Sequence, residues 1–145
     1  MPEPLSHNRA QLVLVDDDRD TREMYLAWLE HVGFSVLHAD NAEAGFHLAV
    51  NGRPQVVITD HRLKTGPTGS ELCRRLKKDP RTEHIPTLLM TGAAERITSE
   101  HALDAGCAVV RLKPYLPDDM LRDIDAIIRG DRVHRFPAEH DQRPD

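Results

Sequence analysis

The sequence predicts an α/β domain built on a doubly wound parallel sheet, in which helices cover both faces of the sheet. Two observations lead to this prediction. Five short apolar runs alternate along the chain with five stretches that have the apolar spacing of amphipathic helices. The run at Gln55–Thr59 is almost wholly apolar or β-branched, as expected for a strand that is covered on both faces. Strict alternation of strands and helices is typical of parallel sheets with right-handed crossovers. Five such units are too few to close a barrel.

The first strand is predicted at Leu12–Val15 and the first helix at Asp20–His31. Apolar residues recur in this helix at three- and four-residue spacing, which predicts its buried face. They are Met24, Ala27, Trp28 and Val32. Asp18 or Asp20 can cap the start of the helix, and Gly33 can adopt the left-handed conformation after its last turn.

The second strand is predicted at Phe34–Leu37, and Asn41 is expected to cap the helix that follows. That helix should end near Gly52, because Pro54 lies just beyond it. A third helix is predicted at Thr68–Lys78. Its expected buried residues are Leu72, Cys73 and Leu76.

The fourth strand is predicted at Thr87–Met90, a fourth helix at Glu95–Ala105, and the fifth strand at Ala108–Leu112. Pro117 suits the first turn of a last helix, which Gly130 should end. The residues of this helix expected to face the sheet are Met120, Leu121, Ile124, Ile127 and Ile128.

Composition predicts a single domain at residues 10–130 between two polar tails, residues 1–9 and 131–145. The formal net charge of −5 argues against a nucleic-acid partner, and no apolar stretch is long enough to span a membrane. The N-terminus has no basic region followed by an apolar core, so we expect a cytoplasmic protein without a secretory signal. Cys73 and Cys107 form no Cys-x-x-Cys pair and are expected to be reduced, partly buried thiols.

Four of the predicted strands end in residues that phosphoryl-transfer chemistry uses. In chain order they are Asp16–Asp18, Asp60, Thr91 and Lys113. Because the carboxyl ends of parallel strands meet at one edge of the sheet, these residues should share a crevice. A buried Asp60 needs a compensating charge, from the ammonium of Lys113 or from a divalent cation. Several carboxylates around one small ion are typical of Mg²⁺.

The acidic triplet also has simpler explanations. Aspartates before a helix often cap it and favour its positive end. A calcium-binding loop is excluded, because Thr21 stands where a glycine is required and Ala27 where a closing glutamate is required. The Asp-x-Asp-x-Thr signature of haloacid-dehalogenase-like phosphatases is out of register at Arg19 and Thr21.

The ordered set of motifs resembles the receiver domain of two-component response regulators. The matching pieces are Val15-Asp16-Asp17-Asp18, Ile58-Thr59-Asp60, Met90-Thr91-Gly92 and Lys113-Pro114-Tyr115. The resemblance extends over about Leu12–Arg129 and includes Gly45 and the pair Ala105-Gly106. It implies a flavodoxin-like fold with five helices and the strand order 2-1-3-4-5.

The resemblance also implies a metal site and a phosphoacceptor. Asp60 would accept a phosphoryl group from a phosphohistidine on a sensor histidine kinase or a histidine phosphotransfer protein. Asp16 and Asp17 would hold Mg²⁺ together with Asp60 and the backbone carbonyl of Arg62.

Two further roles follow from the same resemblance. Thr91 would hydrogen-bond to the phosphoryl group. Lys113 would pair with Asp60 at rest and with a phosphoryl oxygen afterwards.

The sequence departs from the family's pattern in three places. Leu63-Lys64 replaces a common Met-Pro pair, and the loop at Thr65–Thr68 is one residue longer than usual. Val110 stands where the family often has an aromatic residue that changes rotamer. Coupling between the phosphorylation site and a partner should therefore follow another route. We also expect Arg62 to lean over the phosphoryl group and alter its hydrolysis.

The leading functional hypothesis is a single-domain response regulator, because residues 131–145 leave no room for a DNA-binding domain. It would signal by phosphorylation-controlled interaction with an unknown downstream protein or by phosphorelay transfer, as a monomer or a phosphorylation-dependent dimer. No enzymatic activity is expected beyond self-phosphorylation from small donors and self-dephosphorylation. The alternatives are a phosphate-independent scaffold and a Mg²⁺-dependent phosphohydrolase, for which His61 is the nearby candidate acid or base.

Overall fold

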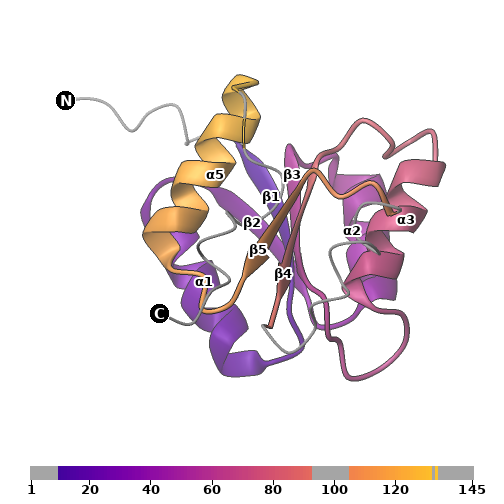
Figure 1. Cartoon of the computed structure of the whole chain (residues 1–145), viewed down its shortest axis with the longest axis horizontal. Helices are drawn as coiled ribbons and strands as arrows, with labels where there is room; N and C mark the ends of the chain where they lie inside the picture. The colour runs from indigo at the N-terminus through magenta and orange to yellow at the C-terminus, as the bar shows by residue number, and fades with distance from the viewer. Residues whose placement is uncertain (1–9, 93–104, 132, 134–145) are drawn as a thin grey trace, which may run out of the picture.

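A computed structural model of the chain describes residues 10–92, 105–131 and 133, which form an α/β domain around a five-stranded parallel sheet (Figure 1). The strands are β1 (Gln11–Val15), β2 (Ser35–Ala39), β3 (Val56–Asp60), β4 (Thr87–Thr91) and β5 (Val109–Leu112). They lie in the order 2-1-3-4-5, and every neighbouring pair is parallel. The predicted fold class and strand order are therefore confirmed.

Helices cover both faces of the sheet (Figure 1). On one face lie α1 (Arg19–His31) and α5 (Pro117–Arg129), and on the other lie α2 (Ala42–Gly52) and α3 (Gly69–Lys78). The predicted helix at Glu95–Ala105 falls almost wholly outside the described residues. None of the described helices has the length and apolar character needed to cross a membrane.

The sheet divides the buried apolar side chains into separate clusters. Along β1, Leu12 and Leu14 pack with α1 and α5, whereas Val13 and Val15 pack with α2 and α3. This alternation follows from the two-residue period of a strand. All residues of β3 and β4 are buried, which agrees with the apolar runs that predicted strands covered on both faces.

The predicted buried face of α1 is wrong by part of a turn. Tyr25 and Leu29 are the buried residues of this helix, while Met24 is 47% exposed and Ala27 is exposed. Trp28 is partly buried against the cluster under α1 and α5. Tyr25 can lie in the core because its hydroxyl donates a 2.6 Å hydrogen bond to the backbone carbonyl of Tyr115.

The helix ends form much as the sequence predicts. The side chain of Asp18 accepts a hydrogen bond from the backbone N–H of Thr21, and that of Asn41 caps α2 in the same way. Gly33 and Gly130 adopt the left-handed conformation after α1 and α5, with φ of 110° and 79°. The caps satisfy backbone groups that the first and last turns of these helices leave without an intrahelical partner.

Candidate functional site

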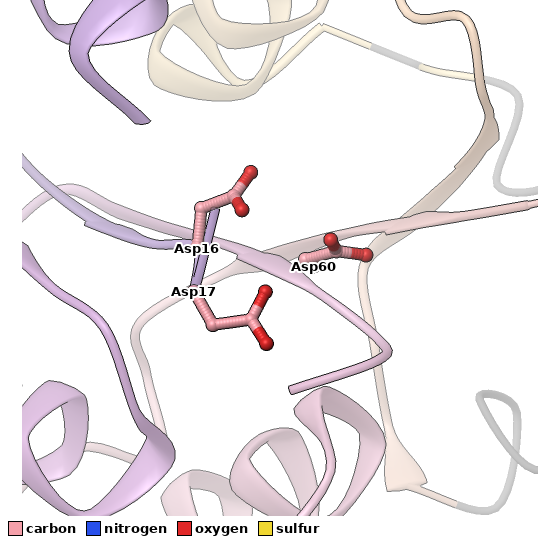
Figure 2. A group of neighbouring side chains, drawn as sticks. All are labelled: Asp16, Asp17 and Asp60. Atoms are coloured by element: carbon pink, nitrogen blue, oxygen red, sulfur yellow. The ribbon is translucent and has the colours of Figure 1, made fainter. Parts of the chain in front are cut away.

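Three carboxylates gather at the carboxyl ends of β1 and β3. The two strands are neighbours, and Val15 pairs with Thr59 in the parallel register. Asp16 and Asp17 directly follow β1, and Asp60 is the last residue of β3. Figure 2 shows the side chains leaving these strand ends, and the three residues can each offer a carboxylate oxygen within 4.8 Å of the other two.

The carboxylate of Asp16 is buried and only half satisfied. Its Oδ1 accepts a 2.9 Å hydrogen bond from the backbone N–H of Asp18, whereas its buried Oδ2 has no partner among the described residues. Burial raises the pKa of Asp16 to about 6, and the negative charge of Asp60 adds to this effect, while Lys113 opposes it. A buried, unpartnered oxygen beside two more carboxylates fits a hard divalent cation such as Mg²⁺.

Asp60 forms an ion pair with Lys113. The Lys113 Nζ donates a 2.7 Å hydrogen bond to Asp60 Oδ2, and the Asp60 side chain is only 7% exposed. Lys113 follows β5 and precedes a cis peptide bond to Pro114. The ammonium of Lys113 thus compensates the charge of a carboxylate that is almost wholly removed from solvent.

Thr91 lies between these elements as the last residue of β4. It pairs with Leu112 in the sheet, and its carbonyl accepts a 2.8 Å hydrogen bond from the backbone N–H of Lys113. On its other side, Asp60 pairs with Met90. The hydroxyl residue is thus held between the strand ends that carry the carboxylate and the ammonium, and it is 2% exposed.

The loop after β3 is bound to the acidic cluster. The backbone N–H of Lys64 donates a 2.5 Å hydrogen bond to Asp17 Oδ2. Arg62, in the same loop, is exposed. The imidazole Nδ1 of His61 lies 3.0 Å from the Ser70 hydroxyl at the start of α3. His61, the candidate acid or base of the phosphohydrolase alternative, therefore already has a hydrogen-bond partner.

Two contacts around the site were missed by the sequence reasoning. The Nη1 of Arg22 donates a 2.8 Å hydrogen bond to the backbone carbonyl of Asp16, and so holds the end of β1 from one turn into α1. A Cβ at Gly69 would lie 2.1 Å from the carbonyl oxygen of Asp60, so only glycine lets α3 start this close to β3. The glycine after a Gly-Pro turn could have signalled such an approach, whereas no sequence pattern marks Arg22.

Comparison with known proteins connects this geometry to a family. A model described as the response regulator receiver domain matches residues 12–125. The chain is 31% identical over 118 residues to the phosphate regulon transcriptional regulatory protein PhoB of Pseudomonas aeruginosa. This match covers 81% of the chain and 51% of PhoB. It is 30% identical to Protein PilH of the same organism, over 83% of the chain and 99% of PilH.

The chain thus spans about half the length of PhoB and almost the full length of PilH. Solved structures agree with the sequence matches. A putative response regulator from Chloroflexus aurantiacus has a TM-score of 0.77 at 26% identity and covers 83% of this chain and 98% of its own. A CheY-like receiver domain protein from Methanospirillum hungatei has the same TM-score and identity, over 83% of this chain and 94% of its own.

Proposed function

Because the chain belongs to the response regulator receiver domain family, we propose that it signals by accepting a phosphoryl group on Asp60. The observation that carries this proposal is the 2.7 Å pair between Lys113 and Asp60, placed beside the carboxylates of Asp16 and Asp17. The ammonium lies where it can pass from the carboxylate to a phosphoryl oxygen, and the neighbouring carboxylates suit a divalent ion.

The transfer step uses residues that already lie together. A carboxylate oxygen of Asp60 attacks the phosphorus of a phosphohistidine, the P–N bond breaks, and the products are an aspartyl phosphate and a free imidazole. Lys113 then leaves the carboxylate and binds a phosphoryl oxygen. The Thr91 hydroxyl donates a hydrogen bond to another phosphoryl oxygen.

Mg²⁺ is the cofactor that fits this step. Asp16, Asp17 and Asp60 would hold it, with the backbone carbonyl of Arg62 as a further ligand. When bound, the ion neutralises the charge that gathers on the transferring phosphoryl group. The unpartnered Oδ2 of Asp16 supports this assignment.

The proposed phosphodonor is a sensor histidine kinase or a histidine phosphotransfer protein in the cytoplasm. The phosphorylated protein would signal to a downstream protein or pass its phosphoryl group on in a phosphorelay, as a monomer or a phosphorylation-dependent dimer. Near-complete coverage of PilH supports a single-domain regulator. Self-phosphorylation from small donors and self-dephosphorylation are the only reactions that we propose for the chain itself.

Intact-mass measurement after incubation with acetyl phosphate and Mg²⁺ tests the proposal. We expect the wild type to gain one phosphoryl group, and the gain to disappear in Asp60→Asn and in EDTA. Asp20→Asn makes the same chemical change at an exposed residue of α1 and should leave the gain intact. An adduct that persists in Asp60→Asn would show that another residue is the phosphoacceptor. No adduct in the wild type, together with no binding of beryllofluoride, would favour a phosphate-independent scaffold.

A further inference from the structure

An open groove lies along α3 and reaches Phe46 of α2, on the side of the sheet away from α1 and α5. Figure 1 shows α2 and α3 together on that side of the sheet. Its larger part has a volume of about 560 Å³. Residues on its walls and floor include Phe46, Arg74, Arg75, Lys78, Pro80 and Arg81. A second hollow of about 240 Å³ shares Glu71 and Arg75 with the first and reaches Pro67 in the loop before α3. We call the two together the α2–α3 groove.

The charge of the α2–α3 groove is opposite to that of the whole chain. Four cationic side chains line its larger part, against the carboxylates of Glu71 and Asp79, although the formal net charge of the chain is −5. Both carboxylates have partners nearby. Asp79 is bound by Arg81 at 2.7 Å, and Glu71 accepts a hydrogen bond from the backbone N–H of Thr68. Because Arg81 is paired with Asp79 and Arg75 with Glu43, the positive charge open to a ligand from outside the chain rests on Arg74 and Lys78.

The cationic side chains differ in how far they are already engaged. Arg75 is held in place, because its guanidinium carbon lies 3.8 Å from the centre of the Phe46 ring and its Nη1 lies 2.7 Å from a carboxylate oxygen of Glu43. Arg74 and Lys78 form no ion pair with any other residue that the structure describes. They lie one helical turn apart on α3 and so present two free positive charges along the groove.

We propose that the α2–α3 groove is a docking surface for an acidic, extended segment of a partner protein. The groove follows α3 from Pro67 to Arg81, and the ten residues of α3 alone span about 15 Å. This length accommodates about four or five extended residues, far more than a single phosphate. Pro80 is exposed beside these charges and offers apolar surface to a peptide side chain, whereas Phe46 lies buried beneath Arg75. This surface is separate from the acidic cluster at the ends of β1 and β3.

Titration of the isotope-labelled full chain with a decaglutamate peptide tests this proposal by NMR. At low salt we expect amide shifts to change along α2, α3 and residues 79–81, with binding that weakens as salt rises. Arg74→Glu combined with Lys78→Glu should weaken binding about tenfold, because each exposed ion pair contributes little alone and two are reversed. Arg122→Glu with Arg129→Glu is the matched control, since it makes the same charge change at exposed residues of α5.

Each other result would overturn the proposal. Equal weakening in the two double variants would mean that the peptide responds only to net charge. Amide shift changes centred on α1 or α5, or no shift changes at low salt, would show that the peptide does not bind in the groove. Competition by inorganic pyrophosphate at the same concentration as the peptide would indicate a small-anion site. If the Glu variant does not fold by circular dichroism, Arg74→Gln with Lys78→Gln replaces it.

Discussion

Asp16 couples the charge of the acidic cluster to the stability of the fold. Its pKa is raised from 3.8 to about 6 by burial, so the folded chain holds a proton at a pH where the unfolded chain has released it. The stabilisation from this proton is complete below about pH 4 and is lost as the pH rises through about 6. The difference of about two pKa units corresponds to about 3 kcal/mol.

We therefore expect Asp16→Asn to be more stable than the wild type at pH 8 in EDTA, by about 2 kcal/mol, and similar to it at pH 4. Urea unfolding at a series of pH values measures this difference. Asp20→Asn, at an exposed position, should follow the wild type at every pH. Parallel pH profiles for the wild type and Asp16→Asn would contradict the expectation.

We predict that Lys113 contributes mainly to the rate of phosphoryl transfer to Asp60, and less to the structure of the unphosphorylated site. Lys113→Met should lower the rate of phosphorylation by acetyl phosphate about 10²-fold, because an ammonium that binds the transferring group is removed. Mg²⁺ affinity should be kept or increased, since a positive charge next to Asp60 is lost. Time-resolved intact mass and Mg²⁺ titration separate the two effects. Lys64→Met, an exposed neighbour of the site, is the control. An unchanged phosphorylation rate in Lys113→Met would show that Lys113 does not assist the phosphoryl transfer.

At the scale of single residues, the sequence predicted where the carboxylates, the hydroxyl and the ammonium would meet, because each follows an apolar run. It could not predict contacts that depend on the tertiary fold. Cys73 and Cys107 were expected to be partly buried, yet both are fully buried. A hydrogen bond with Cys107, together with burial, raises the pKa of Cys73 well above its usual value. Residues this far apart in sequence give no local signal of their contact.

At the scale of elements, the junction between β3 and α3 leaves no room for a side chain at Gly69. Gly69→Ala would place a Cβ 2.1 Å from the backbone oxygen of Asp60, so α3 or the end of β3 must move. We expect a loss of about 1–3 kcal/mol in the free energy of unfolding and slower phosphorylation. Chemical denaturation and the acetyl phosphate assay measure the two effects. Thr65→Ala, in the same loop, should change neither, and wild-type behaviour of Gly69→Ala would contradict the expectation.

Most element boundaries were predicted to within two residues, and the differences have physical causes. The third and fourth strands run one residue further than their apolar character suggests, because Asp60 and Thr91 continue the backbone ladder. Hydropathy cannot show that a polar residue is still paired in a sheet. The α1 face was misplaced for a related reason, since Tyr25 is buried through a hydrogen bond that its residue type does not reveal.

At the scale of the whole molecule, Mg²⁺ should act as a ligand of the folded state. At ten times its dissociation constant, a single ion adds about 1.4 kcal/mol to the free energy of unfolding. We expect a higher melting temperature in Mg²⁺ than in EDTA at pH 8, and a much smaller difference at pH 5, where Asp16 is protonated. Thermal unfolding followed by circular dichroism measures both. Asp60→Asn should reduce the gain at pH 8, and an equal gain at both pH values would contradict the assignment of Asp16 as a ligand.

The sheet that divides the apolar side chains into clusters also divides the surface into two sides that can vary separately. Side chains beneath α1 and α5 belong to one cluster, and those beneath α2 and α3 belong to another. Substitutions with no shared neighbours have nearly additive effects on stability. Inherited changes on the α2–α3 side can therefore accumulate without disturbing the packing on the opposite side. A lineage carrying this fold can therefore change a binding surface on one side while the packing under the other side stays the same.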